Sequence, residues 1–283
     1  MIKLVLTDLD DTLIPKGQDG ASDRAIAAIH AMLDAGLRFG PVSGRVPSAM
    51  GWMFRGDERC YATGAFVNGQ VLRVGGEDVR TIWIDAEPLR ATQRILDSED
   101  LGAFLTVYDL YDPAQVFFAT KRDEWLGHHP TIGPDHHVQM SRAELTEPRY
   151  VKTNILCDGS REQILALRDR LNAEVEGLDF VMPSNVAKII DIMPAGWNKG
   201  TATLALGEML GVAPDEIATF GDSENDLAMI RAVPNSVTVA NADVDVAAAA
   251  RWHIGDTQED AVAVALEQIA AAAETGGMPV FMS

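Results

Sequence analysis

The chain has 283 residues, of which 47% are hydrophobic, and it carries a net charge of −19 with a sequence pI near 4.6. This length can bury a sizeable core in one large domain or two modest ones, and the acidic balance argues against a nucleic-acid or anionic-membrane partner. Two separated cysteines, Cys60 and Cys157, exclude a disulfide framework and a four-sulfur zinc site, so we expect both to be small buried side chains.

The first predicted elements alternate strand and helix. Residues 2–6 are a short β-rich run that predicts a buried strand. Ser22 can cap a helix that ends at Gly36, and residues 37–42 predict a second strand. This order implies a parallel sheet with a right-handed crossover. The inner face of the helix is expected to carry Ile26, Ile29 and Leu33.

The middle of the chain repeats a strand–helix–strand–strand pattern, first near residues 79–120 and again near 150–192. In the second copy, Ser160 and Gln163 form a capping box at the start of the helix. The inner face of that helix is expected to carry Ile164, Leu167, Leu171 and Val175. Such a mixed run between two α/β segments predicts an inserted α+β domain.

After this middle segment the alternation of strand and helix returns. We expect a helix at 199–210, a strand at 216–220, a helix at 224–232, strands at 236–240 and 252–254, and a last helix that ends near residue 273. Gly211 is placed to end the first of these helices. We expect the tail at 275–283 to be loosely held.

Acidic residues follow the first predicted strand. Asp8 and Asp10 lie two positions apart, so their side chains can face the same way at the strand end. Two neighbouring carboxylates repel unless a divalent cation lies between them or one of them is protonated. Mg²⁺ prefers oxygen ligands, and a carboxylate, a backbone carbonyl and waters would suit it. For this motif alone, an acidic turn after a strand remains the alternative.

A second acidic segment, at residues 221–226, opens a helix at the carboxyl end of a later strand. Ligands bind at this edge in open α/β sheets. Helix capping by Asp222 or Ser223 is the alternative function of the segment. Capping explains one of these residues but does not explain Asp222, Asn225 and Asp226 together.

Two weaker signals lie at the same predicted edge. Ser43 and Gly44 end the second strand and offer a hydroxyl and an open backbone amide to a phosphate oxygen. Lys199 begins a helix and is aimed at the sheet edge, although helix N-termini favour anions. When each signal is taken alone, a plain turn is the alternative for Ser43 and Gly44, and a solvated surface lysine is the alternative for Lys199.

Together, and in this order, the four segments resemble the four motifs of the haloacid dehalogenase-like phosphatase superfamily. The pairing of Asp-Leu-Asp-Asp-Thr-Leu at 8–13 with Gly-Asp-Ser-Glu-Asn-Asp at 221–226 is highly specific. The resemblance covers essentially the whole chain, and the insertion looks like the C2B-type cap of the Cof-type branch, subclass IIB. One departure is that Thr63 precedes Gly64-Ala65, where the family commonly has Asn-Gly-Ala.

The resemblance implies a fold and its boundaries. It implies an α/β protein with a Rossmann-like parallel-sheet core at residues 1–80 and 191–283. An α+β cap domain would occupy residues 81–190.

The resemblance also implies roles for single residues. Asp8 would be the nucleophile and Asp10 the general acid/base. Asp226 would be a supporting residue. Separately from the resemblance, Arg45 is a candidate to contact the remote part of the substrate. The Mg²⁺ ion would be bound by Asp8, Asp10 and Asp222. The phosphate would be bound by Leu9, Ser43, Gly44, Lys199 and Asn225. Lys152 and Lys188 are other candidates for a substrate contact, but a surface role is more typical of both.

These roles describe a phosphatase that forms an aspartyl phosphate on Asp8 and acts on a small phosphorylated metabolite. A sugar phosphate is the first substrate class expected. Asp10 would protonate the leaving alcohol and then accept a proton from the hydrolytic water. A sugar phosphomutase of the same fold is the alternative enzyme. A phospho-aspartate signalling switch is a third hypothesis, which Asp10 disfavours because its role is to speed hydrolysis.

Other features carry weaker predictions. A histidine-containing loop with interspersed Pro and Gly is more typical of a solvated loop than of a transition-metal site. Its four histidines are His128, His129, His136 and His137. Asn68-Gly69 predicts a hairpin turn. The sequence shows no signal-peptide pattern and no apolar run long enough to span a bilayer, so we expect a cytoplasmic protein without a membrane partner.

Overall fold

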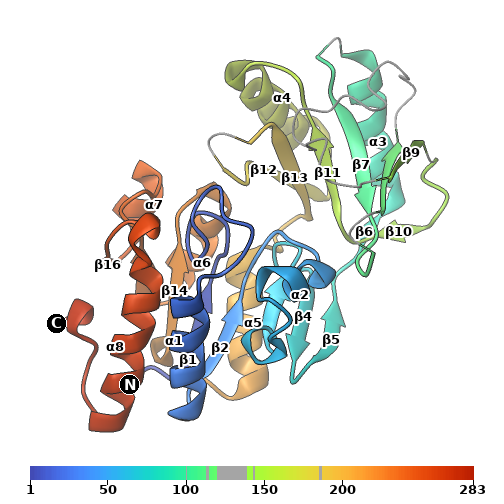
Figure 1. Cartoon of the computed structure of the whole chain (residues 1–283). Helices are drawn as coiled ribbons and strands as arrows, with labels where there is room; N and C mark the ends of the chain where they lie inside the picture. The colour runs from blue at the N-terminus through green and yellow to red at the C-terminus, as the bar shows by residue number, and fades with distance from the viewer. Residues whose placement is uncertain (100, 113–114, 120–138, 143, 185–186) are drawn as a thin grey trace. The chain divides into compact units, whose positions relative to one another are not determined.

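A computed structural model gives the fold and describes residues 1–99, 101–112, 115–119, 139–142, 144–184 and 187–283. The chain forms two compact units (Figure 1). The core unit contains Met1–Arg45, Ala49–Thr81 and Trp197–Ser283. The inserted unit contains Val46–Ser48 and Ile82–Gly196. Among the described helices, none is long and apolar enough to cross a membrane.

The core unit is built on a five-stranded parallel sheet in the order β16-β15-β14-β1-β2. Strand β1 (Leu4–Thr7) pairs with β14 (Ile217–Gly221) on one side and with β2 (Arg38–Pro41) on the other. Strands β15 (Asn235–Thr238) and β16 (Trp252–His253) extend the sheet beyond β14. Every residue of β1 and β14 is buried, as is typical of parallel strands covered on both faces.

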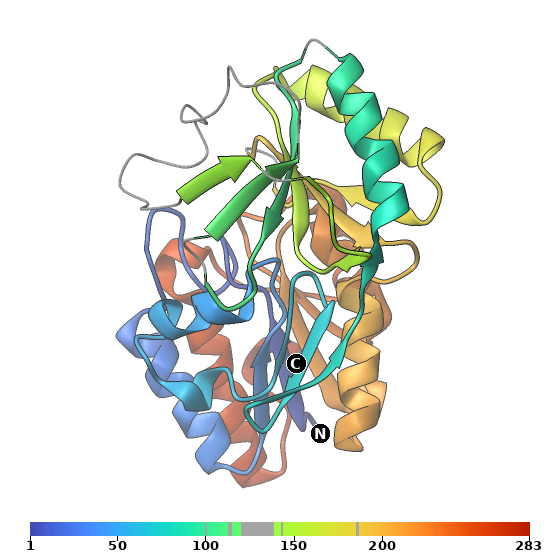
Figure 2. The ribbon, with the colours of Figure 1, turned by 90° about the vertical axis from the view of Figure 1, so that its right-hand side faces the viewer.

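Helices cover both faces of this sheet (Figure 2). Helices α1 (Asp23–Asp34) and α8 (Ala261–Thr275) pack together on one face, and α5 (Lys199–Leu210) packs with α6 (Leu227–Ala232) on the other. Helix α5 begins and ends as predicted, with Gly211 in a left-handed C-cap at φ 65°. The shorter helices are η1 (Pro47–Ala49), α2 (Met50–Met53), η2 (Glu58–Cys60), η3 (Pro214–Glu216), η4 (Glu224–Asp226), α7 (Val244–Ala249), η5 (Thr257–Glu259) and η6 (Val280–Met282).

The inner face of α1 differs from the prediction. Ser22 caps the helix as expected, but Ile26 and Leu33 are only partly buried. The buried residues are Ala25, Ala28, Ile29 and Met32. Helix α1 packs against α8, whose own buried face is rich in alanine, so small side chains on α1 allow the two helices to approach closely.

The prediction of a loosely held tail is wrong. Met282 is buried, and the ring of Phe281 lies 6.3 Å from the ring of Phe220. The backbone amide of Phe281 donates a hydrogen bond to Gln268 Oε1 at 3.1 Å. These contacts hold the end of the chain against the core unit.

A three-stranded antiparallel sheet continues the core unit beyond β2. Its strands are β3 (Gly64–Phe66), β4 (Val71–Val74) and β5 (Glu77–Thr81). The hairpin turn between β3 and β4 is confirmed, but its loop has four residues, and Val67 and Asn68 both have positive φ, 55° and 52°. This conformation is rare for a β-branched residue such as Val67, so the structure around the loop must stabilise it.

The inserted unit contains a six-stranded sheet in the order β12-β13-β11-β7-β8-β9, antiparallel except between β8 and β9. Its strands are β7 (Phe104–Tyr108), β8 (Gln115–Ala119), β9 (Gln139–Arg142), β11 (Thr153–Leu156), β12 (Leu178–Val181) and β13 (Ile189–Pro194). Helices α3 (Ala86–Ser98) and α4 (Arg161–Glu174) pack on one face of the sheet, and β6 (Ile84–Asp85) pairs with β10 (Arg149–Tyr150). The predicted fold class, an α/β core with an inserted α+β unit, is confirmed.

The opposite face of the inserted sheet carries a buried polar group. Lys152 is 8% exposed and its Nζ lies 2.8 Å from Asp191 Oδ1, so its assignment as a surface lysine is wrong. Lys188 is on the surface as expected and lies 3.4 Å from Asp158. The four histidines of the predicted loop lie outside the described residues, whereas Cys60 and Cys157 are both buried and free, as expected.

Candidate active site

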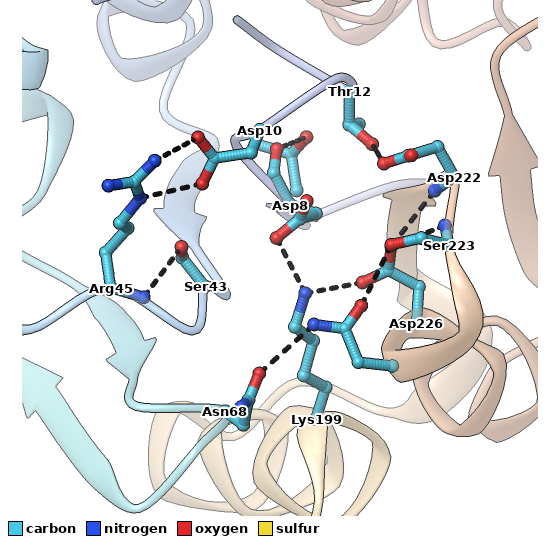
Figure 3. A network of polar contacts seen from close by, with 12 residues as sticks. Asp8, Asp10, Thr12, Ser43, Arg45, Asn68, Lys199, Asp222, Ser223 and Asp226 are labelled. Carbon is cyan, nitrogen blue, oxygen red and sulfur yellow. Dashed lines mark hydrogen bonds and ion pairs between the residues drawn. The ribbon is translucent and has the colours of Figure 1, made fainter. Parts of the chain in front are cut away.

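Side chains from distant segments meet at the carboxyl ends of β1, β2 and β14 (Figure 3). Asp8 follows β1 directly, and its amide donates a hydrogen bond to the carbonyl of Phe220 in β14 at 2.9 Å. Because parallel strands end at the same edge, residues after each strand are brought together there.

Lys199 is the centre of this group. Its ammonium lies 2.6 Å from Asp8 Oδ1 and 2.6 Å from Asp226 Oδ1, and its side chain is 1% exposed. The close approach of α5 and α6 buries it, since a Cβ on Gly200 would lie 2.4 Å from the carbonyl oxygen of Ala228. Burial alone would lower the pKa of Lys199, but the two carboxylates outweigh burial and raise it, so the lysine stays charged.

Asp226 is held by both of its oxygens. Oδ1 accepts a hydrogen bond from Lys199, and Oδ2 accepts from the amides of Asp222 and Ser223 at 3.0 and 3.1 Å. A Cβ on Gly221 would lie 2.6 Å from Asp226 Cβ, so glycine is needed at that position. With both oxygens engaged, Asp226 orients Lys199 and the 222–223 backbone.

Asp8 and Asp222 carry raised pKa values. Burial raises the pKa of Asp8 to about 7, aided by Asp226 and Asp10 and opposed by Lys199. Burial, with Asp226 and Asp8, raises the pKa of Asp222 to about 9, although Asp222 Oδ1 accepts a 2.5 Å hydrogen bond from Thr12. In both cases burial disfavours the charged carboxylate, and the nearby carboxylates add to this effect.

The donor set fits a divalent cation. The cluster holds the carboxylates of Asp8, Asp10, Asp222 and Asp226 but only two cationic side chains among the residues drawn in Figure 3, Lys199 and Arg45. Two negative charges therefore remain, which one divalent ion would neutralise. One oxygen each of Asp8, Asp222 and Asp226 lies within 4.8 Å of the others. All are oxygen donors, the ligands that Mg²⁺ prefers.

Asp10 is bound by Arg45. The guanidinium donates two hydrogen bonds to the carboxylate, at 2.9 and 2.7 Å. Burial would raise the pKa of Asp10, but the hydrogen bonds and charge of Arg45 outweigh it and lower the pKa. Asp10 is therefore ionised while Arg45 holds it.

Ser43, Gly44 and Leu9 lie at the same edge. Ser43 is buried, its amide donates to the carbonyl of Ala65 at 2.9 Å, and its hydroxyl accepts from the amide of Arg45 at 3.2 Å. Gly44 lies between Ser43 and Arg45 in the bend after β2. The side chain of Leu9 is fully buried in the core, so only its backbone is placed to contact a ligand at the site.

Two side chains in the network were missed by the sequence analysis. Thr12 donates a hydrogen bond to Asp222 and belongs to the first acidic motif, so its place in that motif could have predicted a role in the site. Asn68 Oδ1 accepts a 3.3 Å hydrogen bond from Asn225, which in turn accepts from the hydroxyl of Ser223 at 3.1 Å. The Asn68-Gly69 pair had indicated only a turn, and its second role depends on the three-dimensional fold.

A further pair holds the loop after β1. The carbonyl oxygen of Asp11 accepts hydrogen bonds from Asn241 Nδ2 at 2.8 Å and from Thr257 Oγ1 at 2.6 Å. Asp11 has a positive φ of 60° and follows Asp10 directly. Asn241 and Thr257 thus fix the backbone beside Asp10, and no motif had pointed to them.

Comparison with known proteins identifies the family of this chain. The family model for haloacid dehalogenase-like hydrolases matches residues 5–266. Phosphoglycolate phosphatase of Methanoculleus marisnigri is 27% identical over 260 residues, which cover 89% of this chain and 90% of that protein. The structure of SMU.1108c from Streptococcus mutans has a TM-score of 0.80 at 18% identity and covers 96% of this chain and 100% of that one.

A second solved structure bears on the type of insertion. The sugar phosphatase BT4131, described as a member of subclass IIB, has a TM-score of 0.75 at 19% identity, and the match covers 97% of this chain and 99% of that one. The predicted resemblance to the Cof-type branch is thereby confirmed. The chain belongs to the haloacid dehalogenase-like hydrolases, and within them it is a phosphatase.

Proposed function

We propose that the protein is a Mg²⁺-dependent phosphatase of small phosphorylated metabolites, with sugar phosphates as the first substrate class to test. The observation that carries the proposal is the buried carboxylate cluster with two uncompensated negative charges around Asp8 and Asp222. Asp8, Asp222 and the backbone carbonyl of Asp10 would hold the cation. A bound Mg²⁺ would stabilise negative charge on the phosphoryl oxygens.

Asp8 would act as the nucleophile. A carboxylate oxygen of Asp8 forms a bond to phosphorus while the bond from phosphorus to the leaving alcohol breaks, which gives an aspartyl phosphate. Lys199, the hydroxyl of Ser43 and the amides of Leu9 and Gly44 would hold the phosphoryl oxygens. Phosphoryl transfer depends mainly on such positioning and charge stabilisation.

Asp10 would move the protons. In its protonated form it gives a proton to the leaving alcohol, and it then takes one from the water that attacks the aspartyl phosphate. That second attack releases inorganic phosphate and regenerates Asp8. Because Arg45 favours ionised Asp10, Asp10 has to leave Arg45 to carry its proton, and Arg45 would then contact the substrate.

The test is release of phosphate from a panel of phosphorylated metabolites with Mg²⁺, repeated with excess chelator. We expect turnover to be lost on chelation and restored by Mg²⁺; full turnover of metal-free protein in the chelator would overturn the proposal. Asp10→Asn should retain the metal and lose most activity, since acid–base help contributes roughly 10²–10⁴-fold. An isomeric sugar phosphate as main product would instead indicate a phosphomutase.

The printed names of two relatives suggest substrate classes to test. A fold relative is described as a sugar phosphatase and a sequence relative as a phosphoglycolate phosphatase. The panel should therefore contain both classes. We expect the highest kcat/KM on a sugar phosphate, and a clear preference for phosphoglycolate would exclude that part of the proposal.

We propose that residues 81–190 form a cap domain that selects substrates. The catalytic groups named above all lie in the core unit, and the insertion returns to the core just before Lys199. A domain tethered there can exclude water and contact the leaving group. Replacing the insertion with a short linker should abolish discrimination between metabolites but leave slow hydrolysis of p-nitrophenyl phosphate. An unchanged substrate ranking in a folded, capless protein would contradict this role.

A further inference from the structure

A second cluster of metal-binding side chain types occurs in the core unit, separate from the Asp8 cluster. His30 lies in α1, Asp57 is the N-cap residue of η2, and Cys60 is the last residue of η2. One ligand atom of each lies within 4.8 Å of the other two. The three side chains offer nitrogen, oxygen and sulfur.

The η2 turn fixes two of these side chains relative to each other. Asp57 Oδ1 accepts a hydrogen bond from the amide of Arg59 at 3.2 Å, and the amide of Cys60 donates to the carbonyl of Asp57 at 3.1 Å. The second carboxylate oxygen, Oδ2, is thus directed to α1, where it lies 2.7 Å from His30 Nε2. The guanidinium of Arg59 instead bonds Asp34 at 2.6 Å.

Two of the three ligand atoms are shielded and have bonding capacity left over. His30 Nε2 is closed to solvent and, despite its short distance to Asp57, its direction does not allow a hydrogen bond. Cys60 is fully buried, and within the described parts of the chain its sulfur has no hydrogen-bond partner. A shielded imidazole nitrogen and a buried thiol that make no hydrogen bond, and that converge with a carboxylate, point to a shared ligand.

We propose that His30, Asp57 and Cys60 bind a divalent cation of the zinc type, with water as the fourth ligand. Zinc accepts sulfur, nitrogen and oxygen ligands in tetrahedral geometry at about 2.0–2.3 Å, which places its ligands roughly 3–4 Å apart. The three ligand atoms lie within 4.8 Å of one another, and His30 Nε2 and Asp57 Oδ2, now 2.7 Å apart, would move apart to reach this spacing. Mg²⁺ does not suit a thiolate and an imidazole, so the site is distinct in chemistry from the Asp8 cluster.

The charges also balance. A neutral imidazole, a carboxylate and a thiolate together carry two negative charges, which one divalent cation neutralises. Burial, with the charge of Asp57, raises the pKa of Cys60 to about 12, so the thiol of the metal-free protein holds its proton. Binding therefore releases that proton to solvent as the metal–sulfur bond forms. The bound ion would tie α1 to the turn that precedes β3 and so stabilise the core unit.

The test uses the full-length protein, stripped with a chelator and titrated with Co²⁺ and then with Zn²⁺. We expect one equivalent of Co²⁺ to produce a thiolate-to-cobalt absorption band, and we expect Zn²⁺ to displace it and to raise the melting temperature. Cys60→Ser should lose the band, whereas Cys157→Ser, which changes the other buried cysteine, should keep it. His30→Gln should weaken binding at least tenfold, with His253→Gln as its matched control.

The remaining comparisons separate this site from the Asp8 cluster. The band should persist in Asp222→Asn, because that carboxylate belongs to the other cluster. A protein that shows no band, or a band of equal strength in Cys60→Ser, would overturn the proposal. If Cys60→Ser does not fold, the affinity of His30→Gln for the metal decides, because His30 is only partly buried and its variant should fold. Unchanged affinity in His30→Gln would then overturn the proposal.

Discussion

Each unit of the molecule contains a buried lysine bonded to aspartate, and the two lysines differ in the number of carboxylates around them. Lys199 in the core unit contacts Asp8 and Asp226, both at 2.6 Å. Lys152 in the inserted unit contacts Asp191 at 2.8 Å, and its ammonium lies 5.9 Å from the centre of the Tyr108 ring.

The difference separates a structural ion pair from a reactive site. Burying an ion pair is costly, so a balanced pair such as Lys152 with Asp191 is stable only as a pair. The Lys199 group has more carboxylates than its cations can match, and burial, with the neighbouring carboxylates, raises the pKa of Asp8 and Asp222. A surplus of buried charge is stable only with a ligand or a bound proton, which makes it the better indicator of function.

The largest effect should come from Asp8→Asn. We expect kcat to fall by at least about 10³-fold, because the substituted group is the one that attacks phosphorus. The fold should be retained, since an asparagine oxygen can still accept the hydrogen bond from Lys199. Phosphate release and thermal unfolding measure the two outcomes.

Asp191→Asn is the matched change in the inserted unit. It leaves the charge of Lys152 buried without its counter-charge and should lower stability by about 3 kcal/mol. Turnover of p-nitrophenyl phosphate should be retained at temperatures where the protein is folded. A loss of turnover as large as that of Asp8→Asn would contradict the assignment of Lys152 to a structural ion pair and of Lys199 to the reactive site.

The two lysines also show how far the sequence alone could lead. Local patterns predicted α5 from Lys199 to Leu210, because Gly211 and the helical periodicity are signals within a few residues. Whether a lysine is buried depends on packing between distant segments, and that information is absent from local patterns. Lys152 was therefore assigned wrongly to the surface, although the repeated pattern near 150–192 that contains it was predicted.

The candidate site shows the same division. The acidic residues at strand ends were predictable because parallel strands end at one edge of the sheet. The partners of these residues were not, since Thr12 with Asp222 and Asn225 with Asn68 are pairs separated by 210 and 157 positions. Asn241 and Thr257 bond each other and the backbone carbonyl of Asp11, and contacts to a backbone atom leave no motif in the sequence.

A smaller effect is expected from loosening the loop that carries Asp10. Asn241→Ala removes one of the two hydrogen bonds to the Asp11 carbonyl and should lower kcat about tenfold with little change in KM, because small misplacements of a catalytic group slow the chemical step. Asn154→Ala is the control in the inserted unit, where Asn154 accepts from Thr106 and Tyr108. The control should leave kcat on p-nitrophenyl phosphate unchanged. Equal losses of kcat would show that Asn241 has no special role.

A pH titration of stability tests the raised pKa values of Asp8 and Asp222. The folded pKa values of Asp8, about 7, and of Asp222, about 9, exceed the ordinary value of 3.8. The folded state therefore binds more protons than the unfolded state from about pH 4 to 9, and the metal-free protein should become less stable as the pH rises through this window. Lys199 stays charged throughout and adds no slope.

The expected fall in melting temperature is a few degrees, and excess Mg²⁺ should reduce it because the ion binds the ionised carboxylates. Asp222→Asn should flatten the dependence, since it removes the group with the higher pKa. A metal-free protein that gains stability steadily between pH 5 and about 9 would contradict the raised pKa values of Asp8 and Asp222.

The smallest effect is expected in a comparison of the two buried cysteines, one in each unit. Burial raises the pKa of both Cys60 and Cys157 to about 12, so neither thiol should react with iodoacetamide at neutral pH until its unit opens. With transition metals removed, Mg²⁺ should slow labelling of Cys60, because the ion stabilises the core unit, and leave labelling of Cys157 unchanged. Single-cysteine variants, Cys60→Ser and Cys157→Ser, assign the two rates by mass spectrometry. Equal slowing at both positions would mean that the two units open together. Mg²⁺ at the Lys199 site would then also stabilise the unit that contains the Lys152 pair.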